Sequence, residues 1–260
     1  MIVTRWEQAK TVLRQKSCSV VLGVFDGVHR GHIDLLSRAQ NEPDAFPVVI
    51  TFRNHPASLL APEGAPPLLM TLQQRVEALE RAGIGACVLI DFTDDFQRIR
   101  AKAFLEELSA KMQIVRLIVG FNFRCGYRME YGHEEIRAHF KGTATRVEVA
   151  GAVLVDDEPI SSSRLRGVLA RGDLAEYLRI SGREYALDLR GVVPTDQSSP
   201  VRLAIAAGRL IATGQAVPSP GSYRAVFADS NQGEIDLEVA SHYLEGSLAA
   251  SSSLLYIVRN

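Results

Sequence analysis

The chain contains little cysteine, little net charge and no long apolar run. Its three cysteines, Cys18, Cys87 and Cys125, are scattered and form no Cys-x-x-Cys pair, which argues against a disulfide framework and a structural zinc site. The formal net charge is −1 at pH 7, so we expect no general attraction to nucleic acid or to an anionic membrane. No stretch approaches the roughly 18 apolar residues of a membrane-spanning helix, and the first residues lack a signal-peptide core. These absences predict a cytoplasmic protein.

The composition that remains is that of an ordinary globular protein, with 47% hydrophobic and 23% charged residues over 260 positions. Up to residue 184, apolar strand-like runs alternate with amphipathic helical segments. Such alternation is typical of parallel sheets covered by helices, so we predict an α/β domain with a Rossmann-like open parallel sheet over residues 1–184. Strands are expected at residues 19–25, 47–52, 87–90, 115–120, 145–149 and 152–155, and helices at residues 6–13, 33–40 and 101–112 and between Thr71 and Gly83.

Beyond residue 184 the pattern changes to short strand-like runs separated by turns. A tight hairpin is expected at Ala207 and Gly208. We therefore predict a second, small all-β domain over residues 185–260, folded like a barrel. Its strands are expected at residues 187–193, 201–206, 209–214, 222–227, 235–239 and 254–258.

The most informative stretch is residues 23–32, here called the histidine loop, which follows the first long strand and precedes a helix. Glycines in such a turn let the backbone approach a ligand, and the unpaired amides of the helix start favour a phosphate. His29 and His32 add hydrogen-bond donors that can become cationic near neutral pH. Asp26 would either organise the turn or contact a nucleotide. The candidate nucleotide-binding residues are Gly23, Phe25, Asp26, Gly27 and Gly31, with His29 and His32 as the candidate catalytic pair.

The His-x-Gly-His pattern resembles the signature of the nucleotidylyltransferase superfamily, and the preceding Gly-x-Phe-Asp-Gly-Val makes the whole loop similar to the adenylyltransferase module of prokaryotic FAD synthetases. A second motif supports this. Residues 160–166 resemble the family's Ile-Ser-Ser-Thr-x-Ile-Arg, with Ser163 for Thr and Leu165 for Ile. Hydroxyls and amides at a helix start, with Arg166 one turn in, suit a triphosphate. Ser162, Ser163 and Arg166 are therefore expected to bind the nucleotide. Taken alone, the motif would more often be a simple serine cap with solvated arginines.

Two further stretches resemble the family on its flavin side. Residues 51–56 are similar to Thr-Phe-x-Pro-His-Pro, with Asn54 in place of a proline, and residues 119–126 are similar to Val-Gly-x-Asp/Asn-Phe-x-Phe-Gly, with Cys125 in place of an aromatic residue. Residues 69–71 also resemble the family's lead into a long helix. The resemblance implies a flavin-side site. Its members in this sequence are His55, Asn122, Phe123 and Arg124.

The resemblance covers residues 17–185 and implies FMN adenylyltransferase activity, in which ATP and FMN give FAD and pyrophosphate. A Mg²⁺ ion is implied with ATP, because the triphosphate charge must be neutralised and this ion usually binds through phosphates and water. No carboxylate ligand is singled out by the sequence. The expected partners are the small molecules ATP and FMN, with no nucleic acid and no membrane.

The tail departs from the family pattern. In the bifunctional enzymes of the family, a riboflavin kinase barrel follows, and it carries the motif Gly-Phe-Pro-Thr-Ala-Asn. This motif is absent here, since Pro194 and Thr195 are followed by Asp196 and Gln197. Residues 218–223 and 237–239 resemble other kinase segments, the latter including the catalytic Glu at Glu238. We expect a shortened domain without kinase activity, which could serve packing, docking or dimerisation.

Two alternatives remain open. The chemistry could be the same with another phosphorylated acceptor, because the flavin-side matches are weaker than the nucleotide-side ones. The protein could also be a non-catalytic flavin or nucleotide sensor that kept the site and lost turnover.

Overall fold

The computed structural model describes residues 1–190, 192, 201–228, 234–246 and 254–259. The chain separates into two compact units. The first consists of Met1–Pro66 and Val76–Val153, and the second of Pro67–Arg75 and Leu154–Asn260. The domain predicted from the sequence covers residues 1–184, and that boundary stays a prediction.

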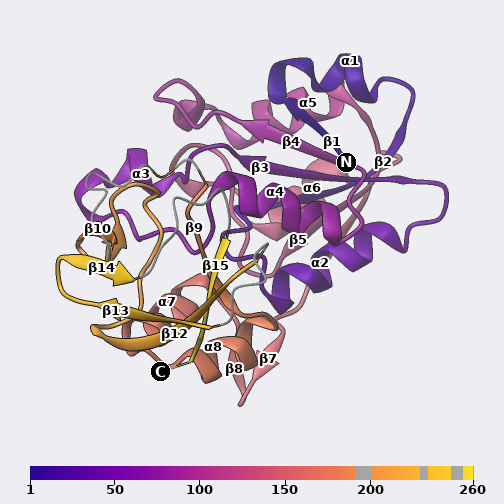
Figure 1. Cartoon of the computed structure of the whole chain (residues 1–260). Coiled ribbons are helices and arrows are strands. Elements are labelled where there is room, and N and C mark those ends of the chain that lie inside the picture. Colours follow the sequence, from indigo (N-terminus) through magenta and orange to yellow (C-terminus); the bar gives the residue numbers. More distant parts are fainter. Residues whose placement is uncertain (191, 193–200, 229–233, 247–253, 260) are drawn as a thin grey trace. The chain divides into compact units, whose positions relative to one another are not determined.

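The first unit is built on a parallel sheet, as the alternation of strands and helices predicts (Figure 1). The strand order is β1-β4-β3-β2-β5-β6, and every neighbouring pair is parallel. The predicted Rossmann-like α/β class is therefore confirmed. The strands are β1 (Ile2–Arg5), β2 (Ser17–Leu22), β3 (Phe46–Phe52), β4 (Ala86–Ile90), β5 (Gln113–Gly120) and β6 (Arg146–Ala150).

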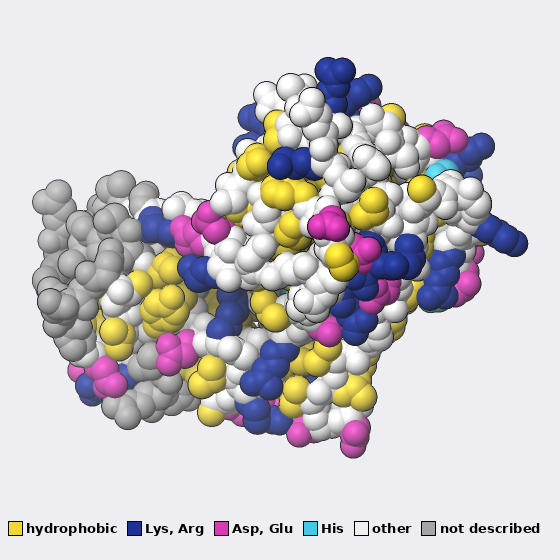
Figure 2. Space-filling model, turned by 90° about the vertical axis from the view of Figure 1, so that its right-hand side faces the viewer, with side chains coloured by type: hydrophobic (Ala, Val, Ile, Leu, Met, Phe, Trp, Pro, Cys, Tyr) yellow, Lys and Arg dark blue, Asp and Glu magenta, His cyan; other side chains and the backbone are white. Residues whose placement is uncertain are grey.

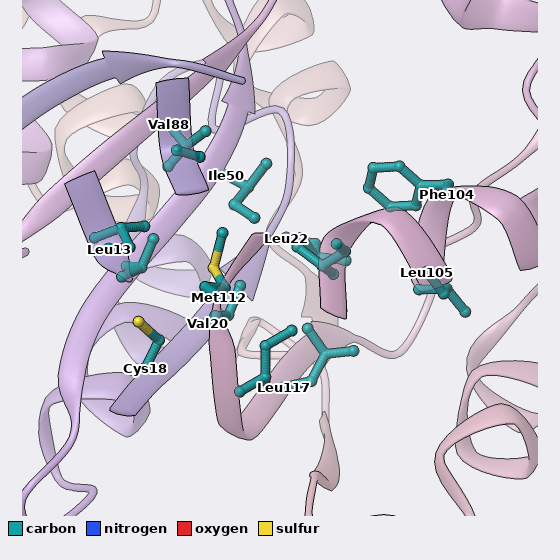
Figure 3. Close-up of a cluster of buried hydrophobic side chains, with 14 of the residues drawn as sticks. Leu13, Cys18, Val20, Leu22, Ile50, Val88, Phe104, Leu105, Met112 and Leu117 are labelled. Atoms are coloured by element: carbon teal, nitrogen blue, oxygen red, sulfur yellow. The ribbon is translucent and has the colours of Figure 1, made fainter. Parts of the chain in front are cut away.

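Helices cover this sheet because its strands are apolar on both sides. Val20 and Leu22 point to one face, where they join a buried hydrophobic cluster together with apolar residues of the neighbouring strands (Figure 3). The helices α1 (Ala9–Leu13), α5 (Ala101–Lys111) and α6 (His133–Phe140) also contribute to this cluster. Val21 lies between these two β2 residues and so points to the other face, against which α2 (Arg30–Gln40) packs with Leu36 fully buried. Each such side chain contributes about 1.5–3 kcal/mol when buried. The remaining helical segments before residue 154 are α3 (Ala57–Leu60), α4 (Leu72–Arg81) and the 3₁₀ turns Trp6–Gln8, Pro62–Gly64, Phe96–Arg98 and Tyr127–Met129.

The strand order places one loop at a special position. Along the chain, β2 is followed by β3 and β4 on one side, whereas β5 and β6 add on its other side. The order therefore reverses between β2 and β5. In open parallel sheets, ligands bind outside the carboxyl ends of the strands at this point of reversal. The histidine loop leaves β2 at that point.

The second unit contains an antiparallel sheet, and the all-β prediction for this part is confirmed. Its seven strands follow the order β11-β10-β14-β13-β12-β15-β9, and two helices, α7 (Ser162–Ala170) and α8 (Leu174–Ser181), precede it in the chain. The strands are β9 (Tyr185–Asp188), β10 (Val201–Ala206), β11 (Arg209–Leu210), β12 (Gly221–Phe227), β13 (Ile235–Val239), β14 (Tyr243–Gly246) and β15 (Leu254–Arg259).

Several predicted elements need correction. The strand expected at residues 152–155 is no part of the parallel sheet, because Leu154–Val155 (β7) pairs only with Glu158–Pro159 (β8) in a short hairpin within the described residues. The strand expected at 209–214 ends at Leu210. The hairpin at Ala207 and Gly208 is confirmed, since both have positive φ, 48° and 69°, and Ala206 pairs with Arg209. Residues 194–197 of the kinase comparison lie outside the described residues.

Residues 67–75 belong to the second unit through specific bonds. Leu68 donates to the Gly214 carbonyl at 2.9 Å and accepts from the Ala216 amide at 2.7 Å, as in a parallel bridge. Thr71 caps α4, the helix predicted between Thr71 and Gly83: its hydroxyl accepts from the Gln74 amide at 3.2 Å and the Gln74 side chain accepts from the Thr71 amide at 3.0 Å. The start of α4 is thus held within the second unit.

A buried glutamine joins the two edges of the antiparallel sheet. The Gln215 carbonyl accepts from Leu210 on β11 at 2.8 Å, while its fully buried side chain bonds to β9: Oε1 accepts from the Asp188 amide at 2.7 Å and Nε2 donates to the Ala186 carbonyl at 3.1 Å. Nε2 also donates to Gln74 Oε1 at 2.9 Å. The edge strands β11 and β9 are therefore connected through the main chain and side chain of Gln215 and not through a ladder of backbone hydrogen bonds.

The described helices include none with the length and apolarity needed to cross a bilayer. On the described part of the face drawn in Figure 2, basic and acidic side chains are intermixed. This mixture agrees with the small net charge of the sequence.

Candidate functional site

The histidine loop is held in a strained path by bonds to β3. The Gly23 amide donates to the Ile50 carbonyl at 3.2 Å, and the Thr51 hydroxyl donates to the Val24 carbonyl at 3.0 Å. Three loop residues have positive φ: Phe25 (56°), Gly27 (95°) and Val28 (33°). For the two non-glycine residues this backbone is unfavourable, and strain of this kind concentrates at functional sites.

The glycines of this loop have a packing role of their own. A Cβ on Gly23 would lie 3.0 Å from the Phe25 ring, and one on Gly31 would lie 3.3 Å from two atoms of the His29 ring. Gly27 is required by its positive φ. These positions therefore shape the loop around Phe25 and His29. Their approach to a ligand stays a prediction.

The two histidines lie together at the start of α2. His29 is the residue preceding the helix, and its carbonyl accepts from the amides of His32 at 2.7 Å and Ile33 at 3.0 Å. The two rings stack with centroids 3.8 Å apart, and the Phe25 ring lies 5.1 Å from that of His32. His29 is only 5% exposed and Asp26 only 2%. Two imidazoles and the positive end of a helix dipole thus occupy one small region, an arrangement that favours a phosphate.

His55 follows β3, the neighbour of β2. Its Nδ1 accepts from the Ala57 amide at 3.1 Å, and its carbonyl accepts from the Ser58 amide at 2.9 Å and hydroxyl at 2.7 Å. With Nδ1 as an acceptor, the proton of the neutral ring lies on Nε2. His55 therefore lies two residues before the first residue of α3, and its bond from the Ala57 amide fixes the orientation of its ring.

The remaining flavin-side candidates follow β5, on the other side of β2. The Phe123 amide donates to the Gly120 carbonyl at 3.0 Å, and its ring packs against the hydrophobic cluster. Arg124 is exposed, and its Nε donates to the Met129 carbonyl at 2.8 Å. Asn122 is exposed. The parallel order β3-β2-β5 brings His55, the histidine loop and Asn122 to one edge of the sheet.

Cys125, which replaces an aromatic residue of the family pattern, has a structural role. It exchanges backbone hydrogen bonds with Tyr131, at 2.9 and 3.1 Å, and packs against the hydrophobic cluster. Burial raises the pKa of its thiol to about 12. This shift favours the protonated thiol at neutral pH, the form that reacts poorly as a nucleophile.

Sequence reasoning missed how the loop after β5 is attached to α5. Glu130 accepts from the Ala101 amide at 2.6 Å, which satisfies a free donor at the helix start, and pairs with Arg100. Hydrogen bonds from Arg100 and Ala101 lower the pKa of Glu130. Gly126, at φ 80°, touches the same helix start, since a Cβ there would lie 2.4 Å from the Ala101 nitrogen. The sequence does not indicate this attachment, because Ala101 and Glu130 lie about 30 positions apart and meet only in the folded chain.

Gly126→Ala is expected to destabilise the protein by on the order of 2–4 kcal/mol, because backbone strain at positive φ adds to a clash with main-chain atoms. Denaturant unfolding measures the change. Gly142→Ala separates the two causes, since Gly142 has φ 81° but nothing within 4 Å of its Cβ position. Equal losses in both variants would show that the clash with α5 contributes nothing.

The serine–arginine motif lies at the start of α7 in the second unit. The capping hydroxyl is that of Ser161, which accepts from the Arg164 amide at 3.1 Å. Ser162 and Ser163 form the first turn, and Arg166 Nε donates to the Pro67 carbonyl at 2.6 Å. The helix start predicted here is confirmed. That this motif and the histidine loop bind one nucleotide stays a prediction.

Arg164 serves the local fold. Its guanidinium donates to the carbonyls of Val155 at 2.9 Å and Glu158 at 3.0 Å, and it pairs with the Glu158 carboxylate at 3.4 Å. It therefore ties the β7–β8 hairpin to α7. The described residues include no group of three or more His, Cys, Asp and Glu side chains that could hold a metal ion.

Comparison with known proteins gives a consistent result. Residues 12–164 match the family model described as FAD synthetase. The chain is also similar to proteins named bifunctional riboflavin kinase/FMN adenylyltransferase. Identity is 31% over 194 residues for Escherichia coli (strain K12), 28% over 201 for Bacillus subtilis (strain 168) and 27% over 176 for Haemophilus influenzae.

These alignments cover 68%, 72% and 66% of this chain but only 58%, 57% and 57% of the three relatives. The chain thus spans little more than half the length of the curated relatives that it matches. Among solved structures, a protein named macrolide-efflux protein from Streptococcus pneumoniae superimposes with a TM-score of 0.79 and 22% identity, over 100% of this chain and 90% of that one. At this identity the likeness shows a shared fold alone.

Proposed function

The chain belongs to the FAD synthetase family, and on that premise we propose that it is an FMN adenylyltransferase, which transfers AMP from ATP to FMN to give FAD and pyrophosphate. The observation that carries the proposal is the histidine loop: within the matched residues, two stacked imidazoles lie at the start of α2, where the strand order of the sheet reverses. A site of this kind suits the innermost phosphate of a nucleotide.

The proposed reaction needs no covalent enzyme intermediate. A phosphate oxygen of FMN attacks the α-phosphorus of ATP, the new P–O bond closes the pyrophosphate link of FAD, and the bond to the β-phosphate breaks with its electron pair going to the leaving pyrophosphate. Positioning and charge stabilisation supply most of the catalysis in such transfers. His29 and His32 would donate hydrogen bonds to the α-phosphate as negative charge grows on it.

Other residues complete the proposed site. Gly23, Phe25, Asp26, Gly27 and Gly31 would form the nucleotide floor, and Ser162, Ser163 and Arg166 would bind the triphosphate. His55, Asn122, Phe123 and Arg124 would bind the flavin side. Mg²⁺ would be held by the triphosphate and water.

The second unit is proposed to lack riboflavin kinase activity. The Gly-Phe-Pro-Thr-Ala-Asn motif is absent from the sequence. Glu238, at the position of the kinase's catalytic Glu, is exposed on β13 and accepts a hydrogen bond from Ser222 at 2.6 Å. This contact gives its carboxylate a partner on the neighbouring strand. Self-association through this unit remains part of the proposal.

An acceptor series tests these assignments. Purified protein with ATP and Mg²⁺ is incubated separately with FMN, riboflavin and other phosphorylated metabolites, and the flavin products and pyrophosphate are measured. Among these acceptors, we expect only FMN to give FAD and pyrophosphate. FMN formed from riboflavin would overturn the kinase assignment. Turnover only with another acceptor would replace FMN as the substrate, and binding of ATP and FMN without turnover would favour the sensor alternative.

A further inference from the structure

Asn54 joins the loops that follow β3 and β4. Its Nδ2 donates to the Phe92 carbonyl at 2.9 Å, and its Oδ1 accepts from the Phe92 amide at 2.9 Å. The side-chain amide thus bonds both main-chain groups of a residue 38 positions away, as a peptide group of a neighbouring strand would. Asn is well suited to this double bond because its side chain offers one acceptor and two donors in one plane.

This contact continues the sheet beyond its regular end. The last β3–β4 pair is Phe52 with Ile90. The Arg53 amide then donates to the Ile90 carbonyl at 2.8 Å, and the Arg53 guanidinium pairs with Asp91 at 2.9 Å. The Asn54 bonds come one step further along both loops. The main chain up to residue 54 is therefore fixed relative to β4.

His55 directly follows Asn54 in the chain, so its position relative to the sheet depends on the Asn54 bonds. Its ring is oriented through Nδ1 by the Ala57 amide, within the same short segment. That local bond sets the direction of the ring but not the place of the segment relative to the sheet. The bonds from Asn54 to Phe92 set that place.

We propose that Asn54 is a positioning residue, which places His55 at the β3 end of the candidate site and thereby sets the affinity for the phosphorylated acceptor. The inference rests on the proposed function, because it takes the acceptor to be FMN and His55 to contact it. Asn54 itself acts only through His55. Since the amide is exposed and its bonds compete with water, its loss is expected to alter the loop and to leave global stability nearly unchanged.

Two substitutions test the proposal. Asn54→Ala removes both bonds, and Asn54→Asp keeps an acceptor for the Phe92 amide but places carboxylate charge against the Phe92 carbonyl. In both we expect KM for FMN to rise about tenfold, the size of effect that two exposed hydrogen bonds can produce. KM for ATP and kcat should stay within about twofold. Thr145→Ala is the control, because it removes one side-chain bond, to the Ile114 carbonyl at 2.8 Å, at the start of β6.

An unchanged KM for FMN in Asn54→Ala would overturn the proposal, and so would equal losses for both substrates or a matching change in Thr145→Ala. Amide hydrogen exchange adds a readout that needs no activity. The Phe92 amide should exchange about tenfold faster in Asn54→Ala than in the unaltered protein, and unchanged exchange would show that the contact does not hold the loop. If the unaltered protein formed no FAD while Phe92 exchange still responded, the proposed function would fail and only the structural contact would remain.

Discussion

His29→Ala is expected to lower kcat for FAD formation by about 10²–10³-fold, the loss seen when one preorganised donor to a developing oxyanion is removed. His29 lies at the start of α2, and its ring stacks on that of His32. In the proposed reaction, charge on the α-phosphate increases in the transition state, so the donor should affect kcat more than the binding of ATP. The measurement is steady-state FAD formation with both substrates varied.

Burial of His29 calls for a structural control. The ring is only 5% exposed and fills the space beside Gly31, so its removal can also loosen the loop. Thermal unfolding should therefore accompany the kinetics, and His29→Asn keeps a donor in part of the same volume. His242→Ala is the matched histidine control, because His242 is exposed in the second unit. If His29→Ala folded normally and retained activity within a few-fold, the histidine would not act on the phosphate.

Gln215→Leu is expected to destabilise the second unit by about 2–4 kcal/mol, because a buried amide that bonds several groups is replaced by an apolar side chain of similar size. The amide of Asp188, a residue only 4% exposed, would lose the partner that it has at 2.7 Å. Gln74 would lose its donor from Gln215 at 2.9 Å. Leucine cannot satisfy either group.

Denaturant unfolding and amide exchange at Asp188 measure the effect. Gln113→Leu is the control, because Gln113 is exposed at the start of β5, and it should change stability by no more than about 0.5 kcal/mol. Gln215→Glu keeps the acceptor for the Asp188 amide but loses both donated bonds and introduces a charge, so it should also be destabilising. A Gln215→Leu variant as stable as Gln113→Leu would show that these side-chain bonds do not hold the two sheet edges together.

Helices and strands could be predicted where a short stretch of sequence carries a clear pattern of apolar or capping residues. The long apolar runs of β2, β3, β4 and β5 are buried strands, and a helix begins directly after Thr71 as expected. β1 was missed because it is a four-residue edge strand with one buried side chain, Thr4. α6 was missed because its apolar contribution consists of Ile136 and Phe140, too few for a clear helical period.

The local structure of the candidate site could be predicted from the sequence, but the distant contacts that support it could not. The order of glycines and histidines predicts a turn before a helix, and the sheet topology places it at the reversal point. The bonds from Asn54 to Phe92 and from Glu130 to Ala101 join positions 38 and 29 residues apart. Gln74 and Gln215 are 141 residues apart. No local pattern predicts such pairs, because each depends on how distant strands are brought together.

The most direct test of the central claim follows the fate of the α-phosphate. Purified protein is incubated with FMN, Mg²⁺ and ATP labelled at either the α- or the γ-phosphorus, and the products are separated. If the histidine loop directs attack at the α-phosphorus, the α-label appears in FAD and the γ-label in pyrophosphate. Label transferred from the γ-position to a flavin, or a folded protein that binds both substrates without forming labelled FAD, would contradict the account.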